Sequence, residues 1–540
     1  MNQVLFVVLI VIGITLVLNI IFSITKNHRM TTQIKSLWDR QLPLENFIRA
    51  NHWYDNQYQT YKHRYNEDEL IDDKTWSDLN LDTVFQYMNY NFTAIGEMRL
   101  YATLRKMHTV EHQHLIASFK EHRGFREKVS LILAKLGKAI YPIFPDQLTV
   151  RSSNPLFLIA TYIPIVGAVI AIFAHQIGLI IVIVSVLFNI VLSILLRRTY
   201  IDDLNSLFYT SNVIISAKKL SDLEGAPEIN VNFNHFIFAR YFSHLLGRVS
   251  SNDEAGAFNI AFKAIFNLDY QLFHLIQHSI KNYEDEVMAC YDYVAEIDNH
   301  YAVALWQKTL PTYCHPEVHE QKAIQFEGLT HPLIEDAVPN DLTIDQHILL
   351  IGSNASGKST FMKSVALNLL LAQTVYTATA TSFNYKPGVI YTSMANADDV
   401  LTGDSYFMAE IKSIKRLFHL STSQPIYCFI DEIFKGTNTT ERIAASEAVL
   451  KYLDANPSYF VLAATHDIEL ASLLAQKYDN YHFNETILDD EIHFDYLIKP
   501  GKADTRNAIE LLRITDFPMT IYENAKALAE SQDQSKTSSN

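Results

Sequence analysis

Cysteine is scarce in this chain, which has three in 540 residues. Cys290, Cys314 and Cys428 are widely spaced, which argues against a disulfide framework and suits a reducing compartment. The densest group of potential metal ligands is Cys314-His315 with His319. Because no second cysteine pair accompanies that group, its spacing does not favour a zinc site.

Positive charge is also limited. The formal net charge is −15, and the longest basic run is Lys412-Ser-Ile-Lys-Arg416. The global field therefore does not attract nucleic acid, although folding can still gather local basic patches. Only 19% of residues are charged and 49% are hydrophobic, which is apolar for a soluble enzyme. A chain of 540 residues is too long for one core, so we expect two to four domains.

Part of the apolar excess lies at the N-terminus. Val4 to Ile24 carries no charge and is long enough to cross a bilayer. The absence of a preceding Lys or Arg and of a small-x-small cleavage site argues against a signal peptide. Lys26, Arg29 and Lys35 follow directly, so the positive-inside rule places the N-terminus outside the cell. We predict a transmembrane helix within residues 1–25.

A second apolar region divides into Pro155–Ala174 and Ile177–Leu196, with His175-Gln176 at the break. Each half has the length of one span, and basic residues (Arg151 and Arg197-Arg198) flank the pair. We predict a membrane hairpin over residues 151–198. With the N-terminal helix, this hairpin makes the chain a multi-pass protein of the cell membrane with three spans, which contact the lipid bilayer. The rest of the chain is then cytoplasmic.

The remaining N-terminal half has the periodicity of helices. Residues 26–150 and 199–324 show apolar residues at helical spacing, as in Phe92–Leu104, and no strand alternation. The polar tail, residues 529–540, has the composition of a disordered segment.

The most informative segment is Gly352-Ser-Asn-Ala-Ser-Gly-Lys-Ser-Thr360, which fits the phosphate-loop pattern G-x-x-x-x-G-K-[ST]. An apolar strand, Ile348–Ile351, is predicted to enter it, and a helix, Phe361–Leu370, to leave it. The glycines let backbone N–H groups surround phosphates, Lys358 can reach the terminal phosphates, and Ser359 can ligate Mg²⁺. The predicted nucleotide-binding residues are Gly352, Ser353, Asn354, Ala355, Ser356, Gly357, Lys358, Ser359 and Thr360.

Acidic and imidazole groups follow two further apolar strands. Asp431 and Glu432 end the run that begins at Ile426, and His466 follows Tyr459–Thr465. In a phosphate-loop protein the first acid would hold Mg²⁺ through water, and the second would orient and deprotonate the attacking water. His466 would sense the γ-phosphate or position that water. Alone, the acids could be a helix cap and His466 a structural residue.

A polar loop, Gly403-Asp404-Ser405, precedes a predicted helix within the block Asn396–Glu410. A helix N-terminus with a serine binds anions well, so this loop could contact a phosphate. The plainer interpretation is a simple helix cap.

Together these motifs resemble the ATPase domain of the MutS family of mismatch-repair proteins over roughly residues 325–525. The likeness rests on His331-Pro332, Val338-Pro-Asn-Asp341, the phosphate loop, the Asn396–Glu410 block, Asp431-Glu-Ile-Phe-Lys-Gly-Thr437, Ala464-Thr-His-Asp467 and Gly501-Lys-Ala-Asp-Thr-Arg-Asn507. Weaker likeness reaches Thr93-Ala-Ile-Gly96 and Ile297-Asp298, which look like the start and return of the family's lever.

The resemblance implies an α/β P-loop ATPase domain of ABC type over residues 325–528, preceded by a mainly helical core and lever region that the membrane helices interrupt. It implies ATP and Mg²⁺ as cofactors and a homodimer with composite sites. Glu432, His466 and Lys358 would be catalytic, Ser359 and Asp431 would hold the metal, and Ser405 would reach the nucleotide of the partner subunit. The family closes a clamp around DNA.

The chain departs from the family pattern in several places. Lys435 stands where D-E-x-x-R-G-T has arginine, which loses the planar fork. Asn438-Thr-Thr-Glu-Arg442 replaces S-T-x-x-D-G, and Ala337 replaces the aromatic residue that often stacks on adenine, so the adenine platform is unassigned. The mismatch-recognition domain has no room before the ATPase, and the membrane hairpin interrupts the lever.

Three functions compete. The first is a membrane-anchored ATPase that acts on DNA, and the second is an ATP-driven membrane signalling or interaction module without DNA. The third is an ABC transporter, which we reject because three spans make no pathway and no L-S-G-G-Q sequence occurs.

Overall fold

The structure is a computed structural model. It describes residues 28–38, 71–105, 112–138, 152–246, 263–320, 323–352, 356–394, 406–420, 424–435, 437–488, 491–502 and 517–537, together with residues 21, 24, 25, 58, 62, 512 and 513. The predicted N-terminal span, Val4 to Ile24, lies almost entirely outside the described residues.

The chain forms two compact units, which are described separately. The first comprises residues 1–67, 87–102 and 111–309, and the second comprises residues 68–86, 103–110 and 310–540. Two segments from the predicted helical region, 68–86 and 103–110, therefore belong to the C-terminal unit. The described part of the N-terminal half is helical and the C-terminal part is α/β, so the coarse fold prediction is confirmed.

The described elements of the first unit are helices. Residues 28–38 are helical. The other helices of this unit are most of α5 (Ala94–Leu104), α6 (Gln113–Glu121), α7 (Arg123–Leu136), α8 (Pro155–Ala160), α9 (Ile163–Phe173), α10 (His175–Ser221), η3 (Phe233–Phe236), α11 (Ile237–Leu246), α13 (Leu268–Asn282) and α14 (Glu284–Thr309).

A buried carboxylate joins α14 to the start of α5. Asp298 accepts hydrogen bonds from the backbone N–H of Phe92 (3.0 Å), the N–H of Thr93 (2.8 Å) and the Thr93 hydroxyl (2.6 Å). These bonds satisfy donors at a helix N-terminus. A Cβ at Gly96 would lie 2.2 Å from Asp298 Oδ2, so only glycine fits at this position. Burial raises the pKa of Asp298 to about 6, although its three hydrogen bonds oppose that shift.

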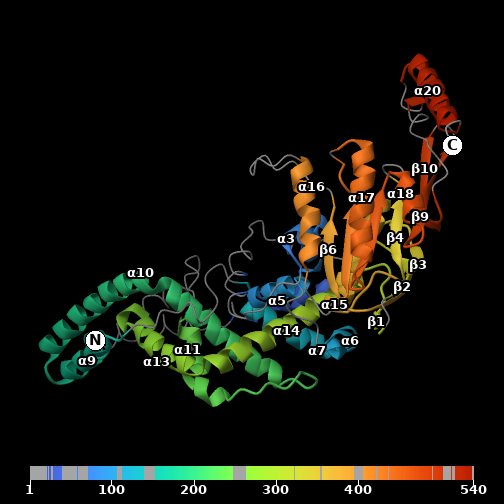
Figure 1. Cartoon of the computed structure of the whole chain (residues 1–540). Coiled ribbons are helices and arrows are strands. Elements are labelled where there is room, and N and C mark those ends of the chain that lie inside the picture. Colours follow the sequence, from blue (N-terminus) through green and yellow to red (C-terminus); the bar gives the residue numbers. More distant parts are fainter. Residues whose placement is uncertain are drawn as a thin grey trace. The chain divides into compact units, whose positions relative to one another are not determined.

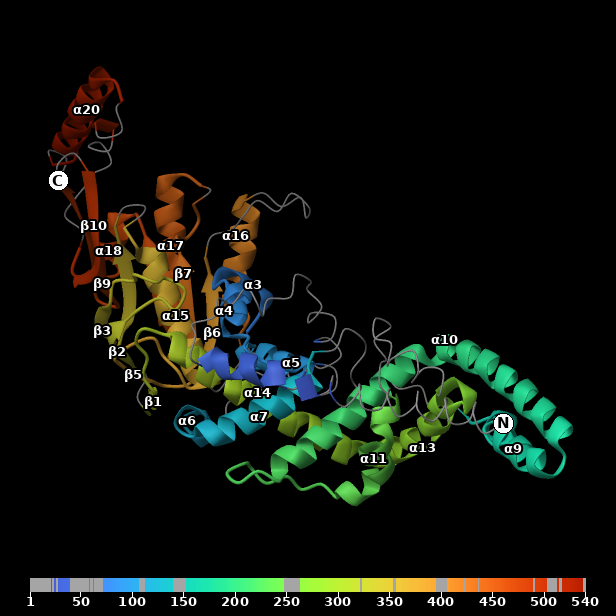
Figure 2. The ribbon, with the colours of Figure 1, turned by 180° about the vertical axis from the view of Figure 1, so that it is seen from behind.

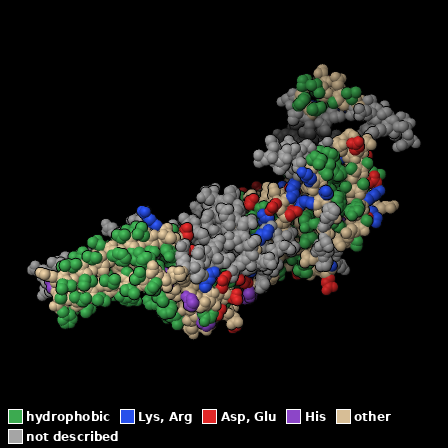
Figure 3. Space-filling view, turned by 60° about the vertical axis from the view of Figure 1, so that its left-hand side comes forward, with side chains coloured by type: hydrophobic (Ala, Val, Ile, Leu, Met, Phe, Trp, Pro, Cys, Tyr) green, Lys and Arg blue, Asp and Glu red, His purple; other side chains and the backbone are tan. Residues whose placement is uncertain are grey.

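The predicted hairpin consists of two helical segments long and apolar enough to cross a membrane, Pro155–Phe173 and His175–Leu196. The break falls at Ala174, beside the predicted His175-Gln176. Only 22% of each segment is buried, whereas a core helix of a soluble protein would be mostly buried. Apolar side chains cover much of the hairpin surface in Figure 3.

The first hairpin segment is interrupted between α8 and α9, and proline explains the break. Pro164 has no backbone N–H, so the carbonyl of Ala160 loses the helical donor four residues later. Asn189 of α10 supplies a replacement, because its Nδ2 donates to Ala160 O at 3.0 Å and to Ile265 O at 2.8 Å. Gln271 Nε2 donates to Leu158 O at 2.8 Å. Polar side chains thus satisfy the carbonyls at the break.

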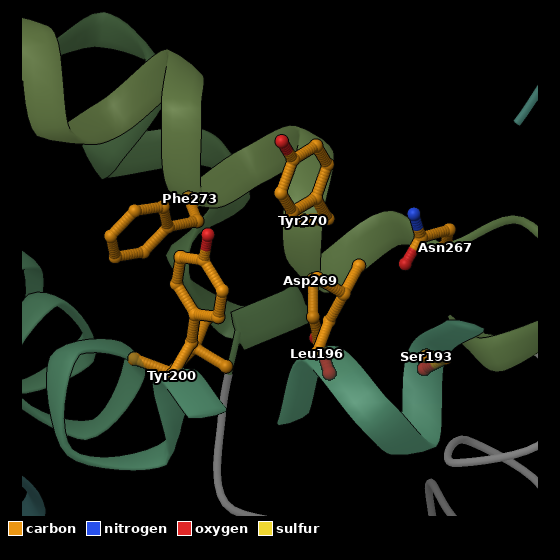
Figure 4. A pocket seen from close by; sticks show the side chains of 8 residues that line it. Ser193, Leu196, Tyr200, Asn267, Asp269, Tyr270 and Phe273 are labelled. Carbon is orange, nitrogen blue, oxygen red and sulfur yellow. The ribbon is translucent and has the colours of Figure 1, made fainter. Parts of the chain in front are cut away.

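Helix α10 is one continuous helix of 47 residues that begins in the hairpin and continues beyond it, within the first unit, to Ser221 (Figure 1). Its Tyr200 lies against Tyr270 and Phe273 of α13, with ring centroids 6.2 and 5.5 Å apart, respectively (Figure 4). The cavity beside these rings measures about 10 Å³, enough for one water molecule. Helix α10 therefore packs against α13 directly after its apolar segment ends at Leu196.

The second unit contains two sheets and several helices, seen from behind in Figure 2. Its strands are β1 (Glu317–Val318), β2 (Ile324–Leu329), β3 (Asn340–Ile344), β4 (His347–Ile351), β5 (Ser382–Tyr385), β6 (Val389–Ser393), β7 (Ile426–Asp431), β8 (Tyr459–Thr465), β9 (Tyr478–Leu488) and β10 (Glu491–Pro500). Its helices are α3 (Asp73–Asp78), most of α4 (Leu81–Met88), α15 (Lys358–Val375), α16 (Tyr406–Lys415), η4 (Arg416–His419), α17 (Thr439–Asp454), α18 (Ile468–Leu473) and α20 (Met519–Thr537).

The larger sheet positions the candidate site. Its strand order is β10-β9-β4-β8-β7-β6, parallel except for the antiparallel β9–β10 hairpin. Alternate residues of β4, β7 and β8 pack with α16, α17 and α18 on one face, and α15 contacts β7 and β8. Both faces of the central strands are buried, which explains their continuous apolar runs. The ends of β4, β7 and β8 consequently meet at one edge.

The C-terminal tail differs from its prediction. Helix α20 continues to Thr537, so residues 529–537 are helical rather than disordered. The segment is polar, but it contains Glu, Gln and Lys, which propagate a helix well once the preceding turns have formed.

Candidate functional site

The candidate site begins where β4 ends. The chain turns at Gly352, with φ 154°, and enters α15 through Gly357, with φ 103°, a left-handed conformation that favours glycine. Ser353, Asn354 and Ala355 lie outside the described residues. Ser356 Oγ is buried and has no hydrogen-bond partner among the described residues. A buried hydroxyl without a partner at a helix N-terminus suits a phosphate oxygen.

Lys358 is the first residue of α15, and its side chain reaches back to Gly352. The side chain is buried, and its Nζ donates to the carbonyl of Gly352 at 2.9 Å. Burial lowers the pKa of Lys358 to about 8, and nearby Asp431 partly offsets the shift. The loop carbonyl is a weak substitute for an anion, so an ammonium group at this position would gain from a phosphate partner.

The next strand but one contributes the acidic pair. Ser359 Oγ donates to Asp431 Oδ2 at 2.5 Å, which joins α15 to the end of β7. A hydroxyl and a carboxylate are hard oxygen ligands of the kind that Mg²⁺ uses together with waters and phosphate oxygens. Groups of three or more His, Cys, Asp or Glu side chains that could hold a metal are absent from the described residues. The chemistry of Ser359 and Asp431 therefore fits Mg²⁺ only if other ligands come from the nucleotide and water.

Glu432 follows in a strained conformation. Its φ is 57°, and its backbone N–H donates to Ala464 O of β8 at 3.0 Å. Such a conformation is uncommon for a residue with a side chain, and it is concentrated at functional sites. The carboxylate is paired with Lys435, whose backbone N–H also donates to Glu410 Oε1 at 3.0 Å. Lysine thus stands beside the acid where the family pattern has arginine.

His466 follows β8 and completes the cluster. Its Nδ1 donates to Gly352 O at 2.6 Å, and its Nε2 lies against Glu432. Burial lowers the pKa of His466, and the positive charge of Lys358 adds to that effect. The structure therefore brings together Gly352, Lys358, Glu432 and His466, although the first and the last are more than a hundred residues apart in the sequence.

A pocket of about 330 Å³ opens beside the loop. It is lined by residues of the β2–β3 connection, the start of α15 and the β9–β10 hairpin, including His331, Ala337, Phe361, Phe483 and Tyr496. Burial lowers the pKa of His331 to about 4, so this imidazole is neutral near pH 7. The size of the pocket and its mixed polar and apolar lining suit a planar heterocycle.

Tyr496 is the aromatic residue that sequence reasoning missed. Its ring lies over Gly357, with Cδ1 3.0 Å from where a Cβ there would stand. The backbone of Tyr496 has φ 52°, within a register shift between Phe494 and Ile498. Asn340 holds the bulge, because its Nδ2 donates to Tyr496 O (3.0 Å) and its Oδ1 accepts from Ile498 N (2.8 Å).

Some predicted features lie outside the described residues. Ser405 and most of the Gly501–Asn507 segment are among them, so the predicted contact with a partner's nucleotide stays a prediction. The described cluster offers a cationic phosphate cradle, a hydroxyl–carboxylate pair, a second carboxylate with an imidazole, and an aromatic pocket. This set is suited to phosphoryl transfer from a nucleotide to water.

Comparison with known proteins points to one family. Residues 348–532 match MutS domain V. The DNA mismatch repair protein MutS of Fusobacterium nucleatum is 29% identical over 277 residues, which is 48% of this chain and 30% of that protein. The proteins of the same name from Staphylococcus carnosus and Aquifex pyrophilus are 30% and 29% identical over 274 residues, which is 48% and 49% of this chain. The matched part spans only 30 to 32% of these three relatives' own length.

Proposed function

This chain belongs to the MutS family, and from that premise we propose that it binds and hydrolyses ATP at the edge of the six-stranded sheet. One observation carries the proposal. Lys358, the Ser359–Asp431 pair, Glu432 and His466 meet around the Gly352–Gly357 loop, next to a pocket that could take the base.

The proposed roles follow from this geometry. Backbone N–H groups at the start of α15 and Lys358 would hold the phosphates, and Ser359 and Asp431 would hold Mg²⁺, which would supply positive charge that neutralises the phosphate groups. Glu432 orients a water molecule and accepts its proton, and His466, fixed by the hydrogen bond of its Nδ1–H to Gly352 O, lies beside Glu432 and the loop. Lys435 must release Glu432 for the carboxylate to act as a base.

The base is proposed to stack on Tyr496, and this gives a testable prediction. Tyr496→Ala should raise the Kd for ATP about 10-fold or more, because stacking of a base on an aromatic ring contributes about 1–3 kcal/mol. Tyr496→Phe is the matched control and should bind like wild type. The measurement is equilibrium titration with a fluorescent ATP analogue, with inorganic triphosphate as competitor. Equal Kd values for all three proteins would remove Tyr496 from the base site.

We further propose that two copies pair through their ATPase domains, with Ser405 reaching the partner's nucleotide, and that the hairpin anchors the chain in the cell membrane. The hairpin exposes apolar side chains, and the carbonyls of Leu158 and Ala160 at its break find donors within the protein. A bilayer requires such internal satisfaction of backbone polar groups.

DNA is the partner that family membership suggests, because the relatives named above are DNA mismatch repair proteins. The net charge of −15 does not favour it, so binding would need a local basic surface. A second candidate is an ATP-driven membrane module without DNA. The continuous helix α10 favours it, because a rigid helix can carry movement between the hairpin and the other helices of the first unit.

One experiment separates these possibilities. The purified full chain in lipid nanodiscs is assayed for ATP hydrolysis with duplex, mismatched or branched DNA, at about 50 and about 200 mM salt. We expect Mg²⁺-dependent hydrolysis in every case. Stimulation by DNA that weakens at higher salt would assign the DNA-linked function, and hydrolysis indifferent to DNA would assign the membrane module. No hydrolysis under any condition would contradict the proposed ATPase.

A further inference from the structure

The departure from the family pattern after Thr437 has a structural role at the start of α17. Asn438 caps this helix, because its Oδ1 accepts from the backbone N–H of Glu441 at 2.9 Å. Thr437 Oγ1 donates to the carboxylate of Glu441 at 3.0 Å. Two side-chain bonds thus fix the first turn of α17. Arg442, directly after Glu441, therefore projects from a well-anchored helix start.

Arg442 makes a two-pronged contact with the residue after His466. Its Nε donates to Asp467 Oδ2 at 2.8 Å, and its NH2 group donates to Asp467 Oδ1 at 2.6 Å. The Asp467 side chain is 8% exposed and that of Arg442 is 25% exposed, so solvent screens the pair little. A planar guanidinium fork on a carboxylate is strong and sets a defined orientation.

Because Asp467 binds Arg442, its carboxylate does not cap the N-terminus of α18. Asp467 is the N-cap residue of α18, yet its carboxylate makes no capping hydrogen bond to that helix. The carboxylate accepts from Arg442 instead, and the backbone N–H of Asp467 donates to Thr465 Oγ1 at 3.0 Å. The turn that carries His466 is consequently held by Thr465 on one side and by Arg442 on the other. His466 itself contacts Gly352 O and Glu432.

We propose that Arg442 is a positioning residue for hydrolysis, which through Asp467 holds the His466 turn in place and links it to the start of α17. This inference rests on the proposed ATPase function. The two hydrogen bonds from Arg442 fix the orientation of the Asp467 side chain and so of the turn that carries His466. His466 therefore stays close to the carbonyl of Gly352 and to Glu432. The same contact gives a route by which a change in the His466 turn moves α17.

The test measures kcat, KM and ATP affinity of the full chain in nanodiscs. Arg442→Gln and Asp467→Asn should each lower kcat about 10-fold, because small misplacements of a catalytic constellation cost this much or more. The Kd for ATP should change less than about 2-fold, since neither residue lies in the phosphate loop. Arg442→Lys, which keeps charge but loses the fork, should fall between Arg442→Gln and wild type. Lys451→Gln is the matched control, because it breaks an exposed ion pair with Glu447 on the same helix and should change nothing.

A double-mutant cycle separates positioning from mere stabilisation. In a His466→Ala background, Arg442→Gln should cause no further loss of kcat, because its effect passes through His466. The inference would be overturned if the kcat losses of Arg442→Gln and His466→Ala multiplied in the double variant. It would also be overturned if Arg442→Gln and Asp467→Asn both kept the wild-type kcat. In either case, hydrolysis by the wild type would still support the proposed function. If Arg442→Gln does not fold, the near-isosteric Asp467→Asn decides the same cycle. Absence of hydrolysis in wild type would instead refute the proposed function, and the inference with it.

Discussion

Replacing Glu432 by glutamine is expected to slow ATP hydrolysis by about 10²- to 10⁴-fold while leaving ATP binding intact. Glutamine keeps the size of the side chain and can still contact His466, but it cannot accept a proton from water. Glu432 has a left-handed backbone conformation and lies between Lys435 and His466, so its carboxylate is held at a fixed place beside the loop. The measurement is steady-state phosphate release, paired with equilibrium binding of ATP.

The matched control for this prediction is Glu447→Gln. Glu447 pairs with Lys451 on the exposed face of α17, so its neutralisation should leave hydrolysis unchanged. Glu432→Gln that hydrolyses ATP at the wild-type rate would show that another group activates the water. Loss of ATP binding in Glu432→Gln would instead show that the carboxylate has a structural role.

Replacing Lys358 by alanine is expected to weaken ATP binding by at least about 100-fold, equivalent to about 2.7 kcal/mol. The ammonium group is buried and donates to the loop carbonyl of Gly352, and a phosphate in this place would add a strong ionic partner. Because burial lowers its pKa to about 8, the free protein loses this charge as pH rises through 8. ATP affinity of wild type should therefore fall above pH 8, and that of Lys358→Ala should not.

Lys477→Ala provides the control for Lys358→Ala, since Lys477 is an exposed lysine of the same unit, paired with Asp454. It should bind ATP like wild type. A thermal melt of each variant shows whether loss of binding reflects unfolding. Equal affinity in Lys358→Ala and wild type, with the same pH dependence, would mean that Lys358 does not contact phosphate.

The central sheet and the clustering of the candidate site residues could be predicted because their signals are local. The runs Ile348–Ile351, Ile426–Asp431 and Tyr459–Thr465 are continuous and apolar, and they form parallel strands buried on both faces. Polar residues that end such strands meet at one edge of the sheet, which is why Asp431, Glu432 and His466 could be assigned to one site.

Other features could not be predicted because they depend on contacts between distant residues or on unusual backbone geometry. Tyr496 reaches the loop only through a bulge with a left-handed backbone, which alternation in a strand does not signal. Asp298 caps α5 from about 200 residues away, so the need for glycine at position 96 is visible only in the fold. The Arg442–Asp467 fork joins two segments whose motifs predict neither partner.

Equilibrium binding of MgATP to the full chain tests whether a nucleotide site lies at the Gly352–Gly357 loop. We expect saturable binding by wild type and by Glu432→Gln, and binding weakened at least about 100-fold in Lys358→Ala. No saturable binding by wild type, or the same affinity in all three proteins, would contradict the assignment of this site.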